Sequence, residues 1–408
     1  MLDLIRRLRA GHLDAATRLL LGQLVMFTGI AAVFPVAPLY VRSHGGGPVA
    51  VALFIAGPMV ANTLAQIPAG HLVDRLGRKP VLIGSRIVFA ALSFALFANL
   101  GPLWLLALFR CGQGFTGGAY VPALRAALAD LTEPGGRAQR YAQLQAIEMV
   151  GLLVGPFIGG AIALWTYSAI FLCSGLGTLL GVTALFRMAE TRSAGHDEEG
   201  PALPGWWRSR VVLVPSLALL AAGVVFAMYD TVWPQYLQAR NVGPFLIGVS
   251  ISVFAIPVLA LAGKAGRLAD RSNRRLLVGG SFLLVAACAT TYPFLRSYPV
   301  ILAVGVVEAC GFTVVEPTLF AVISESTPVE VRGRAMGLGG FFQFGGSAFG
   351  AGVLGSLYGV SARLPFFGAT AACIFAALMS LLWLPLRRLR REATELSAIN
   401  VLDMEVQV

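Results

Sequence analysis

The chain has 408 residues, of which 57% are hydrophobic and 12% charged, and its mean hydropathy is +0.77. Soluble domains carry roughly 25% charged residues, so this composition excludes a water-soluble fold. The net charge of +11 and the pI near 10.0 raise the alternative of a nucleic-acid-binding protein. The positions of the arginines and lysines decide between the two classes.

Apolar stretches follow one another along the chain with short breaks between them. Each is close to the length of about 20 residues that a helix needs to cross roughly 30 Å of hydrocarbon. The sequence therefore predicts an all-α integral membrane protein with twelve transmembrane helices, at residues 17–41, 49–69, 81–100, 103–123, 142–164, 168–188, 211–236, 246–265, 276–295, 300–322, 335–358 and 364–386.

Basic residues are unevenly distributed over the predicted loops. If the N-terminus is cytoplasmic, the outer side receives only Arg42, Arg240, Arg296 and Arg363, and the other loop arginines and lysines fall on the cytoplasmic side. The positive-inside rule gives this pattern for an even number of spans with both termini cytoplasmic. The basic charge is therefore a topology signal, and we exclude nucleic acid as a partner.

Several features argue against a secreted or catalytic protein. The opening segment is interrupted by Asp3, Arg6 and Asp14, unlike the apolar core of a signal peptide. All five cysteines fall inside predicted spans without a CxxC pair, which indicates neither a disulfide framework nor a metal site. No G-x-x-x-x-G-K-[ST] loop occurs, and no soluble segment is long enough for a catalytic domain. We expect no metal, no cofactor and no enzymatic activity.

The second half of the chain repeats sequence patterns of the first half. A charged break divides it into a predicted N-terminal bundle (1–188), a cytoplasmic linker (189–208), a C-terminal bundle (209–388) and a cytoplasmic tail (389–408). The sequence GHLVDR at 70–75 recurs as GRLADR at 266–271, an offset of 270 − 74 = 196, and two shorter matches recur at an offset of 197. Two related bundles form the arrangement in which a central site is reached alternately from each side of the membrane.

The sequence GHLVDRLGRKP joins predicted spans two and three, at residues 70–80. It resembles the G-x-L-a-D-r-x-G-r-k signature of the major facilitator superfamily, and the resemblance extends over residues 19–386. It implies two six-helix bundles related by a pseudo-twofold axis. It also implies a conformational gating role for the motif residues and for the degraded second copy, namely Gly70, Asp74, Arg75, Gly77, Arg78, Lys79, Asp270 and Arg271. The alternative is a generic basic turn.

Arg110 lies near the predicted middle of span four and is followed by Gln113. An ionised side chain at that depth costs several kcal/mol unless it is paired or faces a cavity. Glu148 in span five lies at a similar depth, so we predict that Arg110 pairs with it; purely structural charges satisfied elsewhere are the alternative. The G-x-G-x-x-G pattern at 112–117 sits inside an apolar helix, which excludes a dinucleotide site.

Span five carries a glycine and proline pattern that resembles the G-x-x-x-G-P-x-x-G-G motif of the drug and proton antiporter branch of the same superfamily. Its residues are Gly151, Gly155, Pro156, Gly159 and Gly160. The resemblance implies export, and the alternative is an ordinary packing face of small residues. The corresponding stretch of the second half has no proline, so the motif is present in the first half alone.

Membrane acids are candidates for proton binding, because burial in a low dielectric favours the neutral form of a carboxyl group. Asp230 could instead line a wet vestibule beside Tyr229 and Trp233, and Glu316 could pair with Lys264. The predicted proton-coupling or substrate residues are Glu308, Asp230, Glu148, Arg110 and Gln113.

Together these patterns predict a secondary active transporter of the inner (plasma) membrane that exports small hydrophobic or amphipathic compounds by alternating access. Its expected partners are a small-molecule substrate, protons and the lipid bilayer, and we expect it to function as a monomer. Two alternatives stay open on the same fold. One is an importer or facilitator of a small solute, and the other is a non-transporting membrane receptor or lipid-moving protein.

The gating motif gives a first prediction. Asp74→Asn is expected to lower transport strongly without affecting membrane insertion, because a carboxylate beside a helix N-terminus stabilises one conformation through the helix dipole. Transport per correctly inserted molecule is the measurement. Wild-type rates in the inserted variant would contradict the gating role.

Overall fold

The computed structural model describes residues 14–132, 137–186, 206–327 and 329–384, and regular secondary structure within those ranges is helical throughout. The N-terminal half contains α2 (Ala15–Ala31), α3 (Ala37–Ser43), α4 (Pro48–Leu76), α5 (Arg78–Phe97), α6 (Leu103–Asp130), α7 (Arg137–Ile162) and α8 (Ala169–Phe186). The C-terminal half contains η2 (Trp206–Arg208), α9 (Arg210–Thr231), α10 (Trp233–Gln238), α11 (Pro244–Arg271), α12 (Arg274–Thr291), η3 (Tyr292–Phe294), α13 (Tyr298–Phe312), α14 (Val315–Ser326), α15 (Val329–Val360) and α16 (Leu364–Trp383).

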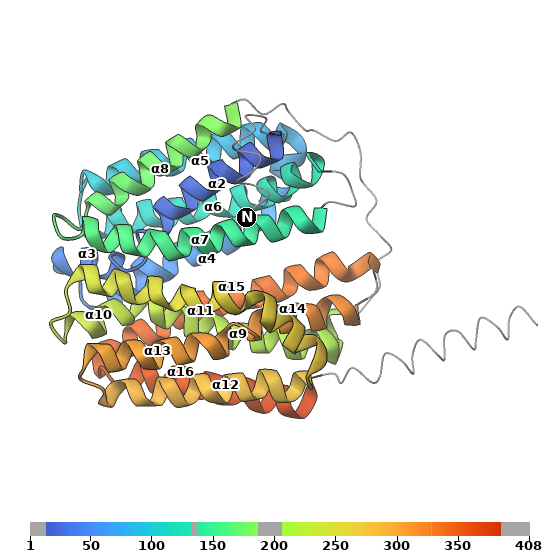
Figure 1. Cartoon of the computed structure of the whole chain (residues 1–408). Coiled ribbons are helices and arrows are strands. Elements are labelled where there is room, and N and C mark those ends of the chain that lie inside the picture. Colours follow the sequence, from blue (N-terminus) through green and yellow to red (C-terminus); the bar gives the residue numbers. More distant parts are fainter. Residues whose placement is uncertain (1–13, 133–136, 187–205, 328, 385–408) are drawn as a thin grey trace, which may run out of the picture.

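The helices form two bundles, one from each half of the chain, with α2 to α8 in the upper part of Figure 1 and α9 to α16 in the lower part. Each predicted span coincides with one helix or with two consecutive helices. The predicted all-α membrane fold is therefore confirmed. Of the predicted domain boundaries, the linker up to residue 205 and the tail lie outside the described residues.

Nine helical stretches in the described part of the chain are long and apolar enough to cross a membrane by length and hydropathy alone. The twelve predicted spans include three more helices. The first, α2, has 17 residues and ends at a break. The other two are α6, which contains Arg110, Arg125 and Asp130, and α15, which is rich in glycine. Charged residues and glycine lower hydropathy, and both occur where helices pack on other helices rather than on lipid.

The first span of each half is broken at an equivalent position. One break lies between α2 and α3, and the other lies between α9 and α10. Pro38 and Pro234 stand in the first turns of α3 and α10, at an offset of 234 − 38 = 196, the same offset as the repeated motif. Proline fits the first turn of a helix because its missing N–H has no partner to lose there. The shared break is structural evidence for the duplication.

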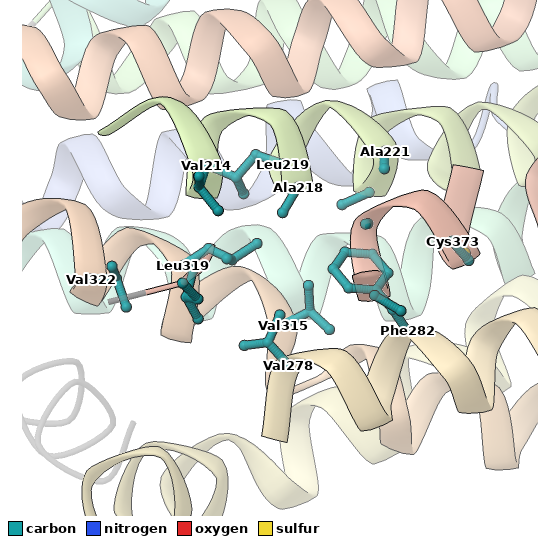
Figure 2. Packing of buried hydrophobic residues seen from close by; sticks show 14 of the residues in the cluster. Val214, Ala218, Leu219, Ala221, Val278, Phe282, Val315, Leu319, Val322 and Cys373 are labelled. Atoms are coloured by element: carbon teal, nitrogen blue, oxygen red, sulfur yellow. The ribbon is translucent and has the colours of Figure 1, made fainter. Parts of the chain in front are cut away.

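The core of the C-terminal half is an apolar cluster shared by α9, α12, α14 and α16 (Figure 2). Leu219 of α9, Phe282 of α12 and Leu319 of α14 are each fully buried in it. Lipid tails are as apolar as these side chains, so the hydrophobic effect contributes little to holding the helices together. Close packing of complementary surfaces has to do so.

Glycine provides that close packing between α9 and α15. A Cβ atom on Gly346 would lie 2.0 Å from the carbonyl oxygen of Leu220, and one on Gly223 would lie 2.0 Å from the carbonyl oxygen of Gln343. The two helices therefore contact each other through their backbones on both sides. Neither position has room for a methyl group.

The two halves contact each other through α7 with α11 and through α4 with α15. A Cβ on Gly248 of α11 would lie 2.2 Å from the carbonyl oxygen of Pro156, and one on Gly355 of α15 would lie 2.7 Å from Cβ of Ala52. Arg42 also donates a hydrogen bond from Nε to Oε1 of Gln235 at 3.1 Å. These contacts lie toward the end of the molecule where α3 and α10 are found (left in Figure 1), which we call the short-loop end.

The glycine packing can be tested with two neighbouring positions. Gly346→Ala is expected to lower the free energy of unfolding by about 1–3 kcal/mol, because the new methyl group forces α9 and α15 apart. Gly345→Ala is the matched control, because a Cβ there meets open space, and alanine favours the helix by about 1 kcal/mol. Thermal unfolding in detergent measures both. Equal effects at the two positions would contradict the close approach.

Candidate functional site

Glu308 of α13 lies in the interior of the C-terminal half, with 1% of the residue exposed. The hydroxyl of Tyr292 donates a hydrogen bond to its Oε2 atom. Tyr229 of α9 also interacts with this carboxyl group. A carboxyl group removed from water requires such hydrogen-bond donors or a proton of its own.

Both tyrosines belong to a continuous aromatic cluster, formed by Tyr229, Trp233, Tyr236, Phe254, Tyr292 and Phe366. The ring centroid of Trp233 lies 5.0 Å from that of Tyr292 and 5.4 Å from that of Tyr229. These separations fall in the attractive range for aromatic pairs, about 4.5–7 Å. The indole N–H of Trp233 donates to Oγ of Ser250 at 2.9 Å. The cluster is therefore an apolar wall in which the Tyr292 hydroxyl hydrogen-bonds Glu308.

Asp230 and Arg110 come from opposite halves of the protein and lie at a similar depth. Asp230 is 238 − 230 = 8 positions from the end of α10, and Arg110 is 110 − 103 = 7 positions from the start of α6. At 1.5 Å per residue both lie about 10–12 Å from the short-loop end. Their opposite charges attract at this shared depth. The attraction links α6 of one half to α9 of the other.

Gln113 explains how the Arg110 side chain is held. Nη1 of Arg110 donates to Oε1 of Gln113 at 2.8 Å, and Nε2 of Gln113 donates to Oγ of Ser93 at 2.7 Å. Gln113 and Ser93 are both buried. One turn of α6 separates the arginine from the glutamine, so their side chains lie on the same helix face. Gln113 is therefore a positioning residue for the arginine in this conformation.

Glu148 of α7 belongs to a separate polar network inside the N-terminal half. Nε2 of Gln23 donates to Oε1 of Glu148 at 3.0 Å, and the hydroxyl of Tyr120 donates to Oε1 of Gln23 at 3.0 Å. The buried guanidinium group of Arg86 stacks on the Tyr120 ring, 3.5 Å from its centroid. Arg86 and Arg125 both attract the Glu148 carboxylate.

Arg110 and Glu148, which the sequence analysis pairs, have different partners in the structure. Asp230 is the opposite charge that acts on Arg110, and Arg125 and Arg86 are those that act on Glu148. Similar depth in the bilayer leaves the choice of partner open, because depth says nothing about the direction in which a side chain leaves its helix. In this conformation the acidic charge that acts on Arg110 comes from the other half of the protein.

The loop of the gating motif is fixed at two points. Nε of Arg78 lies 3.2 Å from Oδ2 of Asp130 at the end of α6, and Nζ of Lys79 donates to the carbonyl oxygen of Phe186 at the end of α8. Gly77 has a φ of 92°, a left-handed value that glycine adopts without strain. Arg75 is exposed. Four other motif residues have side chains outside the described part of the structure, namely Gly70, Asp74, Asp270 and Arg271.

The glycine and proline motif of α7 packs against two helices at once. Cβ atoms on Gly151 and Gly155 would lie 3.2 Å or less from backbone atoms of α2, and one on Gly159 would lie 1.9 Å from the carbonyl oxygen of Ala32, the residue that follows α2. A Cβ on Gly160 would lie 3.1 Å from Cα of Gly248 in α11. Pro156 contacts the same glycine through its carbonyl oxygen. The motif therefore joins α7 to its own half on one face and to the other half on the next.

Comparisons with known proteins agree with this architecture. The sequence profile described as "Major Facilitator Superfamily" matches residues 19–264 and, in a second match, residues 216–398. This chain belongs to the Major Facilitator Superfamily. The chain is similar to the "Multidrug resistance protein 1" of Bacillus subtilis (strain 168). The two sequences are 24% identical over 379 residues, which cover 90% of this chain and 95% of that protein. The "Quinolone resistance protein NorA" of Staphylococcus aureus (strain MSSA476) is 22% identical over 364 residues, 88% of this chain and 93% of that protein.

Solved structures show the same superfamily fold at low sequence identity. The crystal structure of the D-xylose-proton symporter has a TM-score of 0.75 at 14% identity, covering 91% of this chain and 97% of that one. A bacterial homolog of the human lysosomal transporter Spinster, in an inward-facing and occupied conformation, has a TM-score of 0.77 at 14% identity, covering 90% and 95%. The chain is accordingly a multi-pass membrane transporter of this superfamily, with a multidrug resistance protein and a quinolone resistance protein among its relatives.

The sequence analysis missed two groups of site residues. Arg86 is an ionisable residue inside a predicted span, a signal that by itself marks a functional candidate. Tyr292 and Tyr120 carry no such signal, because tyrosine is common in apolar helices and at membrane interfaces. Their roles follow from which carboxyl or guanidinium group the fold brings against them.

Double-mutant cycles on the free energy of unfolding at pH 8 can distinguish an interaction of Arg110 with Asp230 from one with Glu148. Arg110→Ala and Asp230→Ala together are expected to cost at least about 1 kcal/mol less than the sum of the single variants, because either one alone strands a charge. The matched cycle of Arg110→Ala with Glu148→Ala is expected to be additive within about 0.5 kcal/mol. The reverse result would restore the pairing predicted from sequence.

Proposed function

We propose that this transporter exports small hydrophobic or amphipathic compounds in exchange for protons, by alternating access. The observation that carries the proposal is the location of Glu308 and Asp230 on α13 and α9 of one half, both next to the aromatic cluster. The multidrug and quinolone resistance proteins among its relatives support the direction of transport and the substrate class. The proposal includes no catalytic activity and no cofactor.

The aromatic cluster suits the proposed substrates. Ligand sites are lined mostly by apolar and aromatic side chains, with a few polar groups that fix orientation. Tyr229 is partly exposed. It precedes Asp230 in the sequence and interacts with Glu308 in the structure. A flat hydrophobic compound with a polar or cationic group could stack on the rings while its polar group replaces a hydrogen bond of the carboxyl groups.

A carboxyl group that binds either a proton or the substrate, but not both, couples proton entry to substrate export. Each ligand shifts the balance between inward and outward states only through its different affinity for them. One pH unit supplies about 1.4 kcal/mol per proton, and each 100 mV adds about 2.3 kcal/mol per charge moved. A gradient of that size concentrates a substrate at least tenfold, so no nucleotide is required.

The contacts between the halves define the motion that transport requires. The pairs α7 with α11 and α4 with α15 close the short-loop end through glycines and through the hydrogen bond from Arg42 to Gln235. For the site to open toward that end, both helix pairs must separate there. Binding or loss of a proton at Asp230 would alter its attraction to Arg110, which also spans the halves. The same proton could in this way drive the substrate exchange and loosen the closed end.

We further propose that both termini are cytoplasmic, that the short-loop end faces outward, and that the protein works as a monomer. The distribution of arginine supports the orientation, because cytoplasmic loops carry an excess of arginine and lysine. The short-loop end has only four loop arginines in the sequence, and the other loop arginines and lysines belong to the opposite end. The four are Arg42, Arg240, Arg296 and Arg363. The domain boundaries proposed from the sequence follow from the same topology, with bundles at 1–188 and 209–388.

Inverted membrane vesicles test the coupling. Gradient-driven uptake of a fluorescent hydrophobic compound is expected to disappear when the pH gradient is collapsed. Glu308→Gln and Asp230→Asn are each expected to abolish that uptake while sparing downhill exchange, because a neutral amide cannot exchange a proton. Glu316→Gln is the matched control, since Glu316 lies on α14 with Gln343 as its hydrogen-bonding neighbour, and it is expected to keep gradient-driven uptake.

Two results would contradict the proposal. Uptake that persists without a gradient would favour a facilitator, the alternative on the same fold. Accumulation by both neutral variants would show that neither carboxyl group is the coupling group.

A further inference from the structure

Three arginines of the short-loop end line one cavity. Arg240, Arg296 and Arg363 line a surface cavity of about 370 Å³ together with Pro293, Phe294 and Ala362. They come from three separate connections of the C-terminal half, those that follow α10, η3 and α15. Three of the four arginines that the sequence puts at this end are thus brought to one place.

Two of the arginines are held by neighbouring groups. Arg240 donates from Nε to the carbonyl oxygen of Leu295 at 3.1 Å, and its guanidinium stacks on the Tyr236 ring, 3.6 Å from the centroid. The Arg363 guanidinium lies 5.7 Å from the centroid of the Phe294 ring. Carbonyl and ring contacts of this kind fix a guanidinium group without neutralising its charge.

No carboxylate of the surrounding connections balances these charges. The six connections of the short-loop end, residues 44–47, 98–102, 163–168, 239–243, 295–297 and 361–363, are all described and contain neither Asp nor Glu. Two helices, α13 and α16, also begin here without a side-chain cap on their first N–H groups. Helix N-termini carry partial positive charge, so the cavity lies in a strongly positive field.

We propose that this cavity binds a phosphate group, supplied either by the headgroup of an anionic phospholipid or by a free phosphate. Guanidinium groups bind phosphate through paired, charge-assisted hydrogen bonds, and an anion among the three would relieve the repulsion between their charges. The cavity volume lies within the range of small-ligand sites, about 300–1,000 Å³. Phe294, which is 62% exposed at its rim, offers an apolar contact of the kind found at the membrane interface.

The lipid source and the free anion are distinguished by two measurements on the full chain, purified in detergent and stripped of lipid. Native mass spectrometry compares retention of phosphatidylglycerol with that of phosphatidylcholine carrying the same acyl chains. Thermal unfolding at constant ionic strength compares inorganic phosphate with chloride. The variant is Arg296→Gln with Arg363→Gln, which leaves the bonded Arg240 in place. Its matched control is Arg208→Gln with Arg210→Gln, two exposed arginines beside the start of α9 at the opposite end.

We expect wild type and control to bind at least one of the two probes, and the cavity variant to bind it about tenfold more weakly, as the loss of two charge-assisted contacts predicts. Selective loss of phosphatidylglycerol identifies a lipid headgroup site, and selective loss of the phosphate effect identifies a site for a soluble anion. Arg296→Gln alone, at an exposed position, provides the same comparison if the double variant does not fold. Equal binding by wild type and the cavity variants, or no binding of either probe by wild type, would overturn the proposal.

Discussion

An ionised group inside hydrocarbon has a high free energy unless another group of the protein satisfies it, and the interior of this transporter is organised by that constraint. Arg110 is held by Gln113 and attracted by Asp230, while Arg86 lies on the ring of Tyr120 and attracts Glu148. Glu308 takes its hydrogen bond from Tyr292. Each buried charge therefore fixes the positions of two or three helices. Apart from Arg110 and Gln113, which share α6, these partners sit on different helices, so a change in protonation at one of them acts on helix packing.

Close packing of backbones supplies the cohesion that apolar burial cannot supply in lipid. Glycines let α2 approach α7 and let α9 approach α15 within each half, and they do the same for α7 with α11 across the halves. Close contacts of this kind are made of weak, short-range interactions. They are strong while the surfaces match and vanish when the helices separate by a few ångströms. Such contacts suit an interface that must form and break in every transport cycle.

The two halves have kept the same fold and diverged in charge. The first spans break at equivalent places, at α2 with α3 and at α9 with α10. At the offset of 197, Glu308 corresponds to position 308 − 197 = 111, where the first half has Cys111 beside Arg110. The first half thus contributes an arginine at the level where the second contributes acids. This division produces an attraction between the halves, and it leaves the carboxyl groups next to the aromatic cluster of the second half.

The sequence by itself determined the membrane class, the positions of the spans, the duplication and the superfamily, because hydropathy, the offset of 196 and the motif at 70–80 are local properties of the chain. It also indicated Glu308, Asp230 and Arg110 as candidate site residues, since an ionisable residue in an apolar span is conspicuous whatever its direction. Tertiary structure alone decided the partners. Arg110 interacts with Asp230 rather than Glu148, Tyr292 reaches Glu308, and three arginines from separate connections share one cavity. Depth along a helix can be counted from the sequence, but the rotation of each helix about its axis is set by packing against its neighbours, and that rotation decides which side chains meet.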